Sequence, residues 1–227
     1  MRFKAVAFDL DGTLYPDAAL GRRALPLVLG HPLLFAAFAR ARREVRKLVR
    51  APGGPRPRDG AEFRRLQAEL TAAALGPFGR GGPEAAGGLL DEFAYRGVVE
   101  LFAGLPPYPG VVPALDELAA AGLRLAVLSD LPPGRKLALM GLGGRFEAEL
   151  CSEDSGLLKP EPEPFRMLGE ALGLGASEIL YVGNSLACDL AGAKAAGMAA
   201  AMVSRSRVAG AELSFFDWAE LAAFALA

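Results

Sequence analysis

Two aspartates separated by one residue stand at the end of a short apolar run near the start of the chain. The run AVAF (residues 5–8) is followed by DLDGT (residues 9–13), so Gly12 stands where a tight turn can form after Asp9 and Asp11. Side chains at i and i+2 of an extended segment point to one side, so the two carboxylates repel each other. A Mg²⁺ ion, with one acid as nucleophile and the other as proton donor, would satisfy both charges. An acidic turn that caps a helix is the weaker interpretation.

Two further polar residues follow apolar runs, and each is ambiguous when taken alone. Ser129 ends LRLAVLS (residues 123–129), where a hydroxyl and free backbone N–H groups suit a phosphate oxygen. Serine is also an ordinary helix N-cap. Lys159 precedes a proline in GLLKPEP, and it is one of only five lysines in the chain. A lysine after an apolar pair would neutralise a buried anionic group.

The chain contains a single asparagine, Asn184, in the stretch YVGNSLACDLAG (residues 181–192). It lies at the end of the apolar run EILYV and beside a glycine, which is where the other polar clusters also lie. Asp189 follows five residues later. The placement of Asn184 therefore suggests that it belongs to the same group of strand-end residues.

The elements that would position these side chains alternate along the chain. Short runs that are apolar on both faces predict buried parallel strands at residues 5–8, 123–128, 178–182 and 199–203. Helical patterns lie at residues 111–122, 162–173 and 186–197. This alternation predicts an α/β fold with right-handed crossovers, in which ligands bind outside the carboxyl ends of the strands.

Residues 16–105 do not follow this alternation, because their patterns are all helical. We therefore expect a core domain made of residues 1–15 and 106–227, with a helical domain of residues 16–105 inserted after the first strand. One of the inserted helices, over residues 31–50, is rich in arginine. It has the composition of a membrane-surface or anion-binding helix, but the solvated face of an amphipathic helix is the favoured interpretation.

Composition excludes several classes of protein. The 25 basic and 26 acidic residues give a net charge of −1, so we expect no nucleic-acid partner. Cys151 and Cys188 are too few for a disulfide framework, and His31 is the only histidine, which excludes a histidine metal cluster. The sequence has no signal peptide and no apolar segment of about 18 residues, so we expect a soluble, cytoplasmic protein without a membrane partner.

The order of the motifs resembles that of the haloacid dehalogenase-like (HAD) superfamily. DxDGT, a serine at a strand end, Lys-Pro and GNSxxxxD follow one another, and the resemblance covers the whole chain. It implies a Rossmann-like parallel sheet core with an inserted all-helical cap domain of the C1 type. It also implies a Mg²⁺-dependent phosphatase, in which Asp9 attacks phosphorus and Asp11 protonates the leaving alkoxide and then activates water. The positions it implies are Gly12, Thr13, Ser129, Asp130 and Lys159 for phosphate, and Asp9, Asp11, Asn184 and Asp189 for Mg²⁺.

Alternatives within the superfamily stay open. The dehalogenase branch lacks the second acid, so the presence of Asp11 disfavours it. Phosphomutases keep both acids but more often carry a bulkier aliphatic residue at the position of Thr13, which favours hydrolysis. A degenerate member that only binds a phosphorylated ligand or a protein is the third possibility. The expected partner is a small phosphorylated metabolite, and the expected state is a monomer or a homodimer.

Two residues depart from the superfamily pattern. Asn184 stands where an aspartate usually binds Mg²⁺; its amide oxygen remains an acceptable ligand but brings no charge. Ser185 and Asp189 would then contribute through water. Asp130 stands where asparagine is frequent, and an acid beside a phosphate would repel it unless its side chain points away and only its N–H is used.

Overall fold

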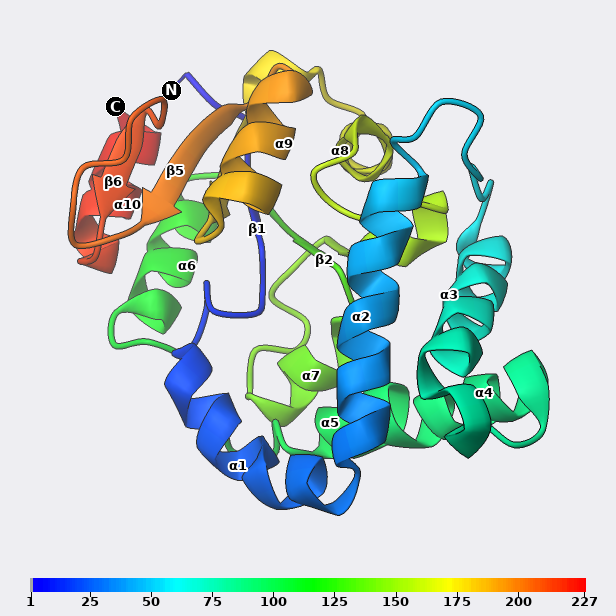
Figure 1. Cartoon of the computed structure of the whole chain (residues 1–227). Coiled ribbons are helices and arrows are strands. Elements are labelled where there is room, and N and C mark those ends of the chain that lie inside the picture. The colour runs from blue at the N-terminus through cyan, green and yellow to red at the C-terminus, as the bar shows by residue number, and fades with distance from the viewer. Residues whose placement is uncertain (1) are drawn as a thin grey trace.

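A six-stranded parallel sheet forms the centre of the molecule (Figure 1). The computed structural model describes residues 2–227. The strands lie in the order β3-β2-β1-β4-β5-β6, and every pair is parallel. Their bounds are β1 Ala5–Phe8, β2 Arg124–Ser129, β3 Ala148–Cys151, β4 Ile179–Gly183, β5 Ala199–Val203 and β6 Leu213–Phe215. Because all strands run the same way, the ends of β1, β2 and β4 meet at one edge of the sheet.

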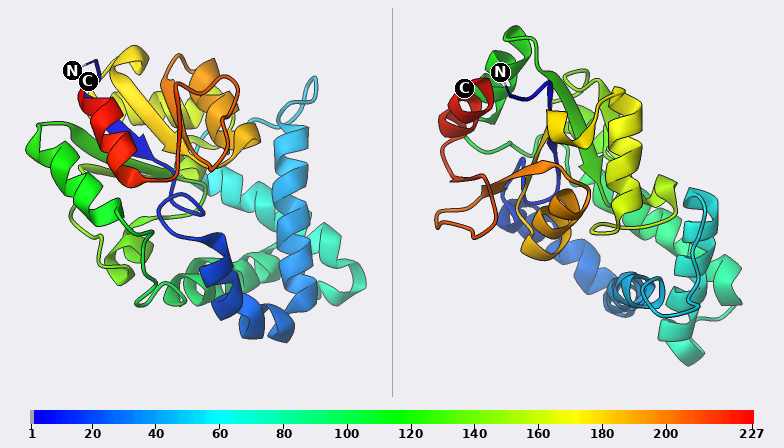
Figure 2. Two further views of the ribbon diagram at one scale, coloured as in Figure 1. Left: turned by 90° about the vertical axis from the view of Figure 1, so that its left-hand side faces the viewer. Right: turned by 90° about the horizontal axis from the view of Figure 1, so that it is seen from above.

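Helices cover both faces of the sheet, as continuous apolar strands require (Figure 2). Val6 and Phe8 of β1 pack with α6 and α10 on one face, whereas Ala5 and Ala7 pack with α8 and α9 on the other. These helices and the remaining elements of the core are α6 Val111–Ala120, α7 Gly134–Leu139, η3 Ser152–Ser155, α8 Pro162–Leu172, η4 Ala176–Glu178, η5 Leu186–Leu190, α9 Ala191–Ala195 and α10 Trp218–Leu226. The predicted α/β fold class is confirmed.

The segment between β1 and α6 is helical. Its elements are α1 Asp17–Gly30, α2 Pro32–Leu48, α3 Gly60–Leu75, η1 Gly76–Phe78, α4 Gly82–Leu90, η2 Asp91–Gly97 and α5 Val98–Glu100. We refer to residues 16–105 as the helical insertion. Helices α2, α3 and α4 lie against one another, with Leu34, Leu75, Leu90 and Phe93 in a small apolar core of their own (Figure 1).

Helix α2 has two distinct faces. Arg40, Arg43 and Lys47 are exposed, as expected for the polar side of an amphipathic helix, and the exposed Arg50 lies two residues beyond the end of the helix. Arg42 is buried on the opposite side of the same helix. Arg46, one turn later, is half-buried on this inner side.

Two strands and one helix were not predicted. β3 has two half-buried residues and one exposed residue, and β6 contains only three residues, so neither shows the continuous apolar run of the central strands. Helix α7 is only six residues long. The predicted helix at residues 186–197 is divided into a π-helical turn, η5, and the short α9.

No single helix within residues 2–227 has the length and apolar composition to cross a membrane. Helices α1 and α2 reach these limits only as a pair, and they are bent by 114° relative to each other.

Candidate active site

Asp9 follows the last residue of β1 and is held in a fixed position. Its N–H donates to the carbonyl oxygen of Val182 in the neighbouring strand β4 at 2.8 Å. Its Oδ2 accepts a hydrogen bond from Thr13 Oγ1 at 2.8 Å, and its Oδ1 accepts one from Lys159 Nζ at 2.6 Å. A side chain fixed by groups from three segments is well suited to act as an oriented nucleophile.

Lys159 lies beneath this carboxylate and is 2% exposed. Its ammonium group also donates to Asp189 Oδ1 at 2.8 Å and to the hydroxyl of Tyr181 at 3.0 Å. Burial alone would lower the pKa of Lys159, but the charges of Asp189 and Asp9 raise it well above its ordinary value. Lys159 is therefore charged, and the Lys159 ammonium group pairs with both carboxylates.

The environment of Asp9 disfavours its ionisation. Burial raises the pKa of Asp9 to about 7, with smaller contributions in the same direction from Asp189 and Asp11, whereas Lys159 lowers it. A buried carboxylate at this pKa gains from any further positive charge placed beside it. The site is thus electrostatically suited to a cation.

Asp11 has partners that the sequence did not indicate. The hydroxyl of Tyr15 donates to its Oδ1 at 2.6 Å, and Lys136 Nζ donates to its Oδ2 at 2.9 Å. Lys136 is 1% exposed, which is rare for a lysine without such a partner. Burial of Asp11 acts in the opposite direction, but Lys136 and Tyr15 lower the pKa of Asp11. The only available signals were the spacing of Tyr15 four residues after Asp11 and the scarcity of lysine.

Gly12 allows two polar side chains to approach the turn after β1. Its φ is +81°, and a Cβ at this position would lie 2.2 Å from Asn184 Nδ2 and 2.7 Å from both carboxylate oxygens of Asp17. Any other residue would push these groups away. Asn184 therefore lies over the loop that carries Asp9 and Asp11, as the sequence suggested, and Asp17 is a neighbour that the sequence analysis missed.

Asp189 makes contacts with both of its carboxylate oxygens. Oδ1 binds Lys159, whereas Oδ2 accepts the N–H groups of Asn184 at 3.1 Å and Ser185 at 2.9 Å. The side chain of Asp189 packs closely against Gly183 at the end of β4, since a Cβ on Gly183 would lie 2.4 Å from the Cβ of Asp189. These contacts fix the turn that presents Asn184. A direct bond from Asp189 to a metal ion stays a prediction.

Ser129 and Asp130 end β2 on the other side of Asp9. Ser129 Oγ accepts the N–H of Leu131 at 3.3 Å and is 3.4 Å from Asp11 Oδ2. The Asp130 carboxylate accepts the N–H of Lys159 at 3.2 Å and a hydrogen bond from Arg46 of α2 at 2.5 Å. Burial would raise the pKa of Asp130, but the nearby cations, including Lys159 and Arg46, lower it. Asp130 is thus an ionised group paired with the helical insertion.

The strand-end residues surround one small cavity of about 170 Å³. Its lining consists of Asp9, Asp11, Asp130, Lys159, Asn184, Ser185, Cys188 and Asp189. Most of the residues proposed from the sequence therefore lie together, including all four proposed for the metal.

The donor set fits Mg²⁺ chemically. Carboxylate and amide oxygens are ligands that this hard cation prefers. Within residues 2–227 no group of three or more His, Cys, Asp or Glu side chains is arranged to hold a metal. The amide oxygen of Asn184 and the carboxylate of Asp9 are both oxygen donors of this kind, and both residues line the cavity.

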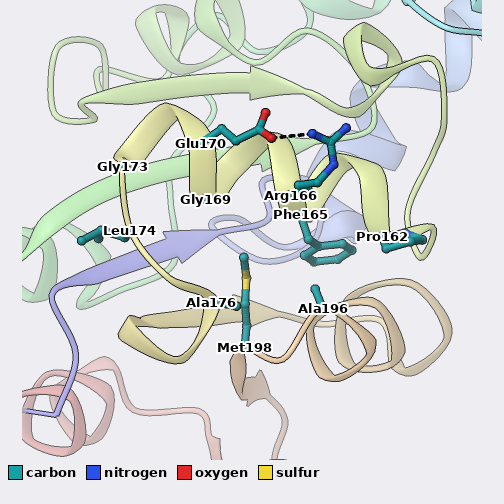
Figure 3. Close-up of a pocket in the computed structure, with 10 residues that line it drawn as sticks. All are labelled: Pro162, Phe165, Arg166, Gly169, Glu170, Gly173, Leu174, Ala176, Ala196 and Met198. Carbon is teal, nitrogen blue, oxygen red and sulfur yellow. Dashed lines mark hydrogen bonds and ion pairs between the residues drawn. The ribbon is translucent and has the colours of Figure 1, made fainter.

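A larger cavity of about 590 Å³ lies elsewhere, beside α8 (Figure 3). Phe165, Leu174 and Met198 give it an apolar lining, and its one carboxylate, Glu170, is paired with Arg166 on the same helix. Beside Glu170 its lining contains no second acid and no hydroxyl, thiol or lysine, so the small cavity at the strand ends, where several such groups meet, is the candidate active site.

The chain is similar to several proteins of known activity. Two relatives are each 32% identical to the chain. One is the glyceraldehyde 3-phosphate phosphatase of Methanopyrus kandleri, with 90% of this chain and 85% of the relative covered. The other is the phosphoglycolate phosphatase of Rhodospirillum rubrum, with 96% and 89% covered. The (S)-2-haloacid dehalogenase of Xanthobacter autotrophicus is 30% identical over 89% of this chain and 75% of its own.

The fold of the chain is also similar to that of a solved HAD phosphatase. The crystal structure of a HAD phosphatase from Thermococcus onnurineus superposes with a TM-score of 0.63 at 26% identity, covering 98% of this chain and 97% of the other. Residues 3–197 match the profile of the haloacid dehalogenase-like hydrolases. The chain therefore belongs to the haloacid dehalogenase-like hydrolase family.

Proposed function

We propose that this protein is a Mg²⁺-dependent phosphatase that hydrolyses a small phosphomonoester through a phosphoaspartyl intermediate on Asp9. The observation that carries the proposal is the arrangement of Asp9. Asp9 is buried at the end of β1 and accepts hydrogen bonds from Lys159 and Thr13. A second carboxylate, Asp11, follows two residues later. Relatives named as phosphatases support the same reaction class.

Asp9 is the nucleophile. Its carboxylate attacks phosphorus in line with the departing oxygen, so that the bond from phosphorus to the ester oxygen breaks as the bond to Asp9 forms. Water then attacks the phosphoenzyme, which releases inorganic phosphate and restores the carboxylate. The hydrogen bonds from Thr13 and Lys159 orient Asp9 before the reaction, which reduces the entropic part of the barrier.

Asp11 is the proton donor to the leaving alkoxide and the base for the water. It is ionised in the free site, because Lys136 and Tyr15 stabilise its carboxylate. A doubly negative phosphoryl group placed beside Asp11 would raise its pKa and supply the condition for protonation. In the second step the ionised form accepts the proton of the attacking water.

Main-chain N–H groups and the side chains of Ser129 and Lys159 bind the phosphoryl oxygens in this proposal. Gly12 and Thr13 provide the turn after β1, and Ser129 provides a hydroxyl at the end of β2. Lys159 offsets part of the charge that Asp9 and the phosphate concentrate there. Asp130 contributes its N–H.

The residues that would hold Mg²⁺ are Asp9 through its carboxylate, Asp11 through its carbonyl oxygen, and Asn184 through its amide oxygen, with Asp189 supporting the turn. When bound, the ion neutralises charge on the transferring group. Asn184 brings no charge, so the protein ligands carry one negative charge fewer than in a site with aspartate at this position.

The helical insertion is the proposed cap, with residues 16–105 as its bounds. Closed over the cavity it excludes water from the reaction and contacts the leaving group. A small phosphorylated metabolite is the expected substrate.

A panel of phosphomonoesters with a chromogenic ester as reference tests the proposal. We expect turnover that requires Mg²⁺ and is lost in Asp9→Asn. The same panel includes a bisphosphorylated sugar activator for mutase activity and a 2-haloacid for dehalogenation, because one relative is a dehalogenase. Binding of phosphate without any turnover would identify the non-catalytic alternative and refute the phosphatase.

A further inference from the structure

Asp130 poses an electrostatic problem in the candidate site. Its carboxylate lines the same cavity as Asp9 and Lys159, and its side chain is about one fifth exposed. A fixed negative charge next to a doubly negative phosphoryl group is repulsive by an amount that depends on nearby cations. Lys159 offsets only part of the repulsion, because its ammonium group is already shared by Asp9 and Asp189.

Arg46, from α2 of the helical insertion, provides the nearest positive charge to the Asp130 carboxylate, and Arg42 of the same helix lies 3.9 Å from the same oxygen. Its Nη2 donates to Asp130 Oδ2 at 2.5 Å, and its Nε donates to the carbonyl oxygen of Lys159 at 3.1 Å. One guanidinium group therefore joins two loops of the core, the loop after β2 and the loop that carries Lys159. The planar geometry of arginine suits such a two-sided contact.

Arg42, one turn earlier on α2, fixes the helix in the same position. Its Nη2 donates to the carbonyl oxygen of Asp130 at 2.8 Å, and its Nη1 donates to the buried Glu153 at 2.5 Å. The hydroxyl of Tyr95, also from the insertion, donates to Glu153 at 2.8 Å. The insertion thus reaches the loop after β2 from a defined direction, and in this arrangement Arg46 faces Asp130.

We propose that Arg46 is a positioning residue that neutralises Asp130, so that the phosphate site accepts a doubly negative group only while the helical insertion is closed against the core. This inference rests on the proposed function. Movement of α2 away from the core would withdraw both Arg46 and the more distant Arg42 from the Asp130 carboxylate and leave its charge in the cavity without an arginine partner. Closure and phosphate binding are therefore coupled, and each favours the other to the same extent.

A double-mutant cycle tests the coupling. The affinity for inorganic phosphate in the presence of Mg²⁺ is measured by calorimetry in the wild type, Arg46→Gln, Asp130→Asn and the double variant. Removing Arg46 alone should weaken phosphate binding by about tenfold or more, since a unit charge is left near the dianion. The double variant should bind phosphate within about threefold of Asp130→Asn, because asparagine needs no counter-charge.

Phosphate binding by the double variant distinguishes an effect of the Arg46 charge from an effect of loosening the helical insertion. If Arg46→Gln acted only by loosening the insertion, Asp130→Asn could not restore binding, and a double variant as weak as Arg46→Gln would overturn the proposal. Unchanged binding in Arg46→Gln would overturn it as well. Arg50→Gln is the control: it removes a cation two residues beyond the end of α2, which pairs with Glu161 rather than with Asp130, and phosphate binding should not change.

The proposed function can fail independently. A wild type that neither binds phosphate nor hydrolyses any ester would refute both the phosphatase and the coupling. A wild type that does both, together with a cycle that shows no rescue, would refute the coupling alone.

Discussion

Replacing the candidate nucleophile should make the metal-free protein more stable at neutral and alkaline pH. The pKa of Asp9 is raised from 3.8 to about 7, and burial is the largest cause. The folded state therefore holds the proton of Asp9 more tightly than the unfolded chain does. The stability that this proton contributes is complete below pH 3.8 and is lost as pH rises toward about 7. Above that range the ionised Asp9 destabilises the fold, and Asp9→Asn removes this cost.

The size of the effect follows from the shift. A difference of about 3 pKa units corresponds to roughly 4 kcal/mol of stability lost at high pH. Asparagine keeps an oxygen for the hydrogen bond from Thr13 but takes one negative partner from Lys159, which reduces the gain to about 2–4 kcal/mol. For a chain of 227 residues this corresponds to a rise in Tm of roughly 5–15 °C.

The assay is thermal unfolding of the wild type and Asp9→Asn in EDTA between about pH 4 and pH 8. The gap in Tm should be large at the alkaline end and close toward the acidic end. Asp116→Asn is the control, because Asp116 is exposed and pairs with Arg145, so its gap should stay small at every pH. Equal Tm values at about pH 8, or a gap that does not change with pH, would refute the assignment of the raised pKa to Asp9.

Three further substitutions test neighbouring contacts. Asn184→Asp should keep or strengthen Mg²⁺ binding and Asn184→Leu should weaken it, by on the order of a few kcal/mol in calorimetry; an unchanged Mg²⁺ affinity in both would exclude Asn184 as a ligand. Lys136→Met should raise the pKa of Asp11 in the substrate complex, so the alkaline limb of kcat should move to higher pH, and an unmoved limb would argue against their pairing during turnover. Lys159→Met should cost roughly 3–5 kcal/mol in denaturant unfolding at neutral pH, since it leaves Asp189 and a second carboxylate without their cation; a loss below about 1 kcal/mol would contradict this.

Local patterns in the sequence accounted for the central strands and the residues at their ends. The runs that became β1, β2, β4 and β5 are apolar on both faces, and β1, β2 and β4 are each followed by a polar residue of the cavity. Parallel strands bring such residues together without any knowledge of the loops. The short edge strands β3 and β6 lack this pattern.

Contacts between distant parts of the chain were not predictable in the same way. Lys136 pairs with Asp11 across 125 residues, and Arg46 pairs with Asp130 across 84 residues. In the sequence Arg46 is one of many arginines on an amphipathic helix, and nothing in its spacing indicates which face meets the core. The sequence places the acid Asp130 where it would repel a phosphate. Its ion pair with Arg46 balances that charge, and no pattern in the sequence indicates this contact.

The most direct test of the account is mass spectrometry of the protein after rapid acid quenching during turnover of a phosphomonoester with Mg²⁺. We predict that the peptide containing Asp9 gains the mass of one phosphoryl group, that Asp11→Asn accumulates this adduct because water is no longer activated, and that Asp9→Asn shows neither adduct nor turnover. Turnover that continues in Asp9→Asn without a phosphorylated peptide would contradict the central claim.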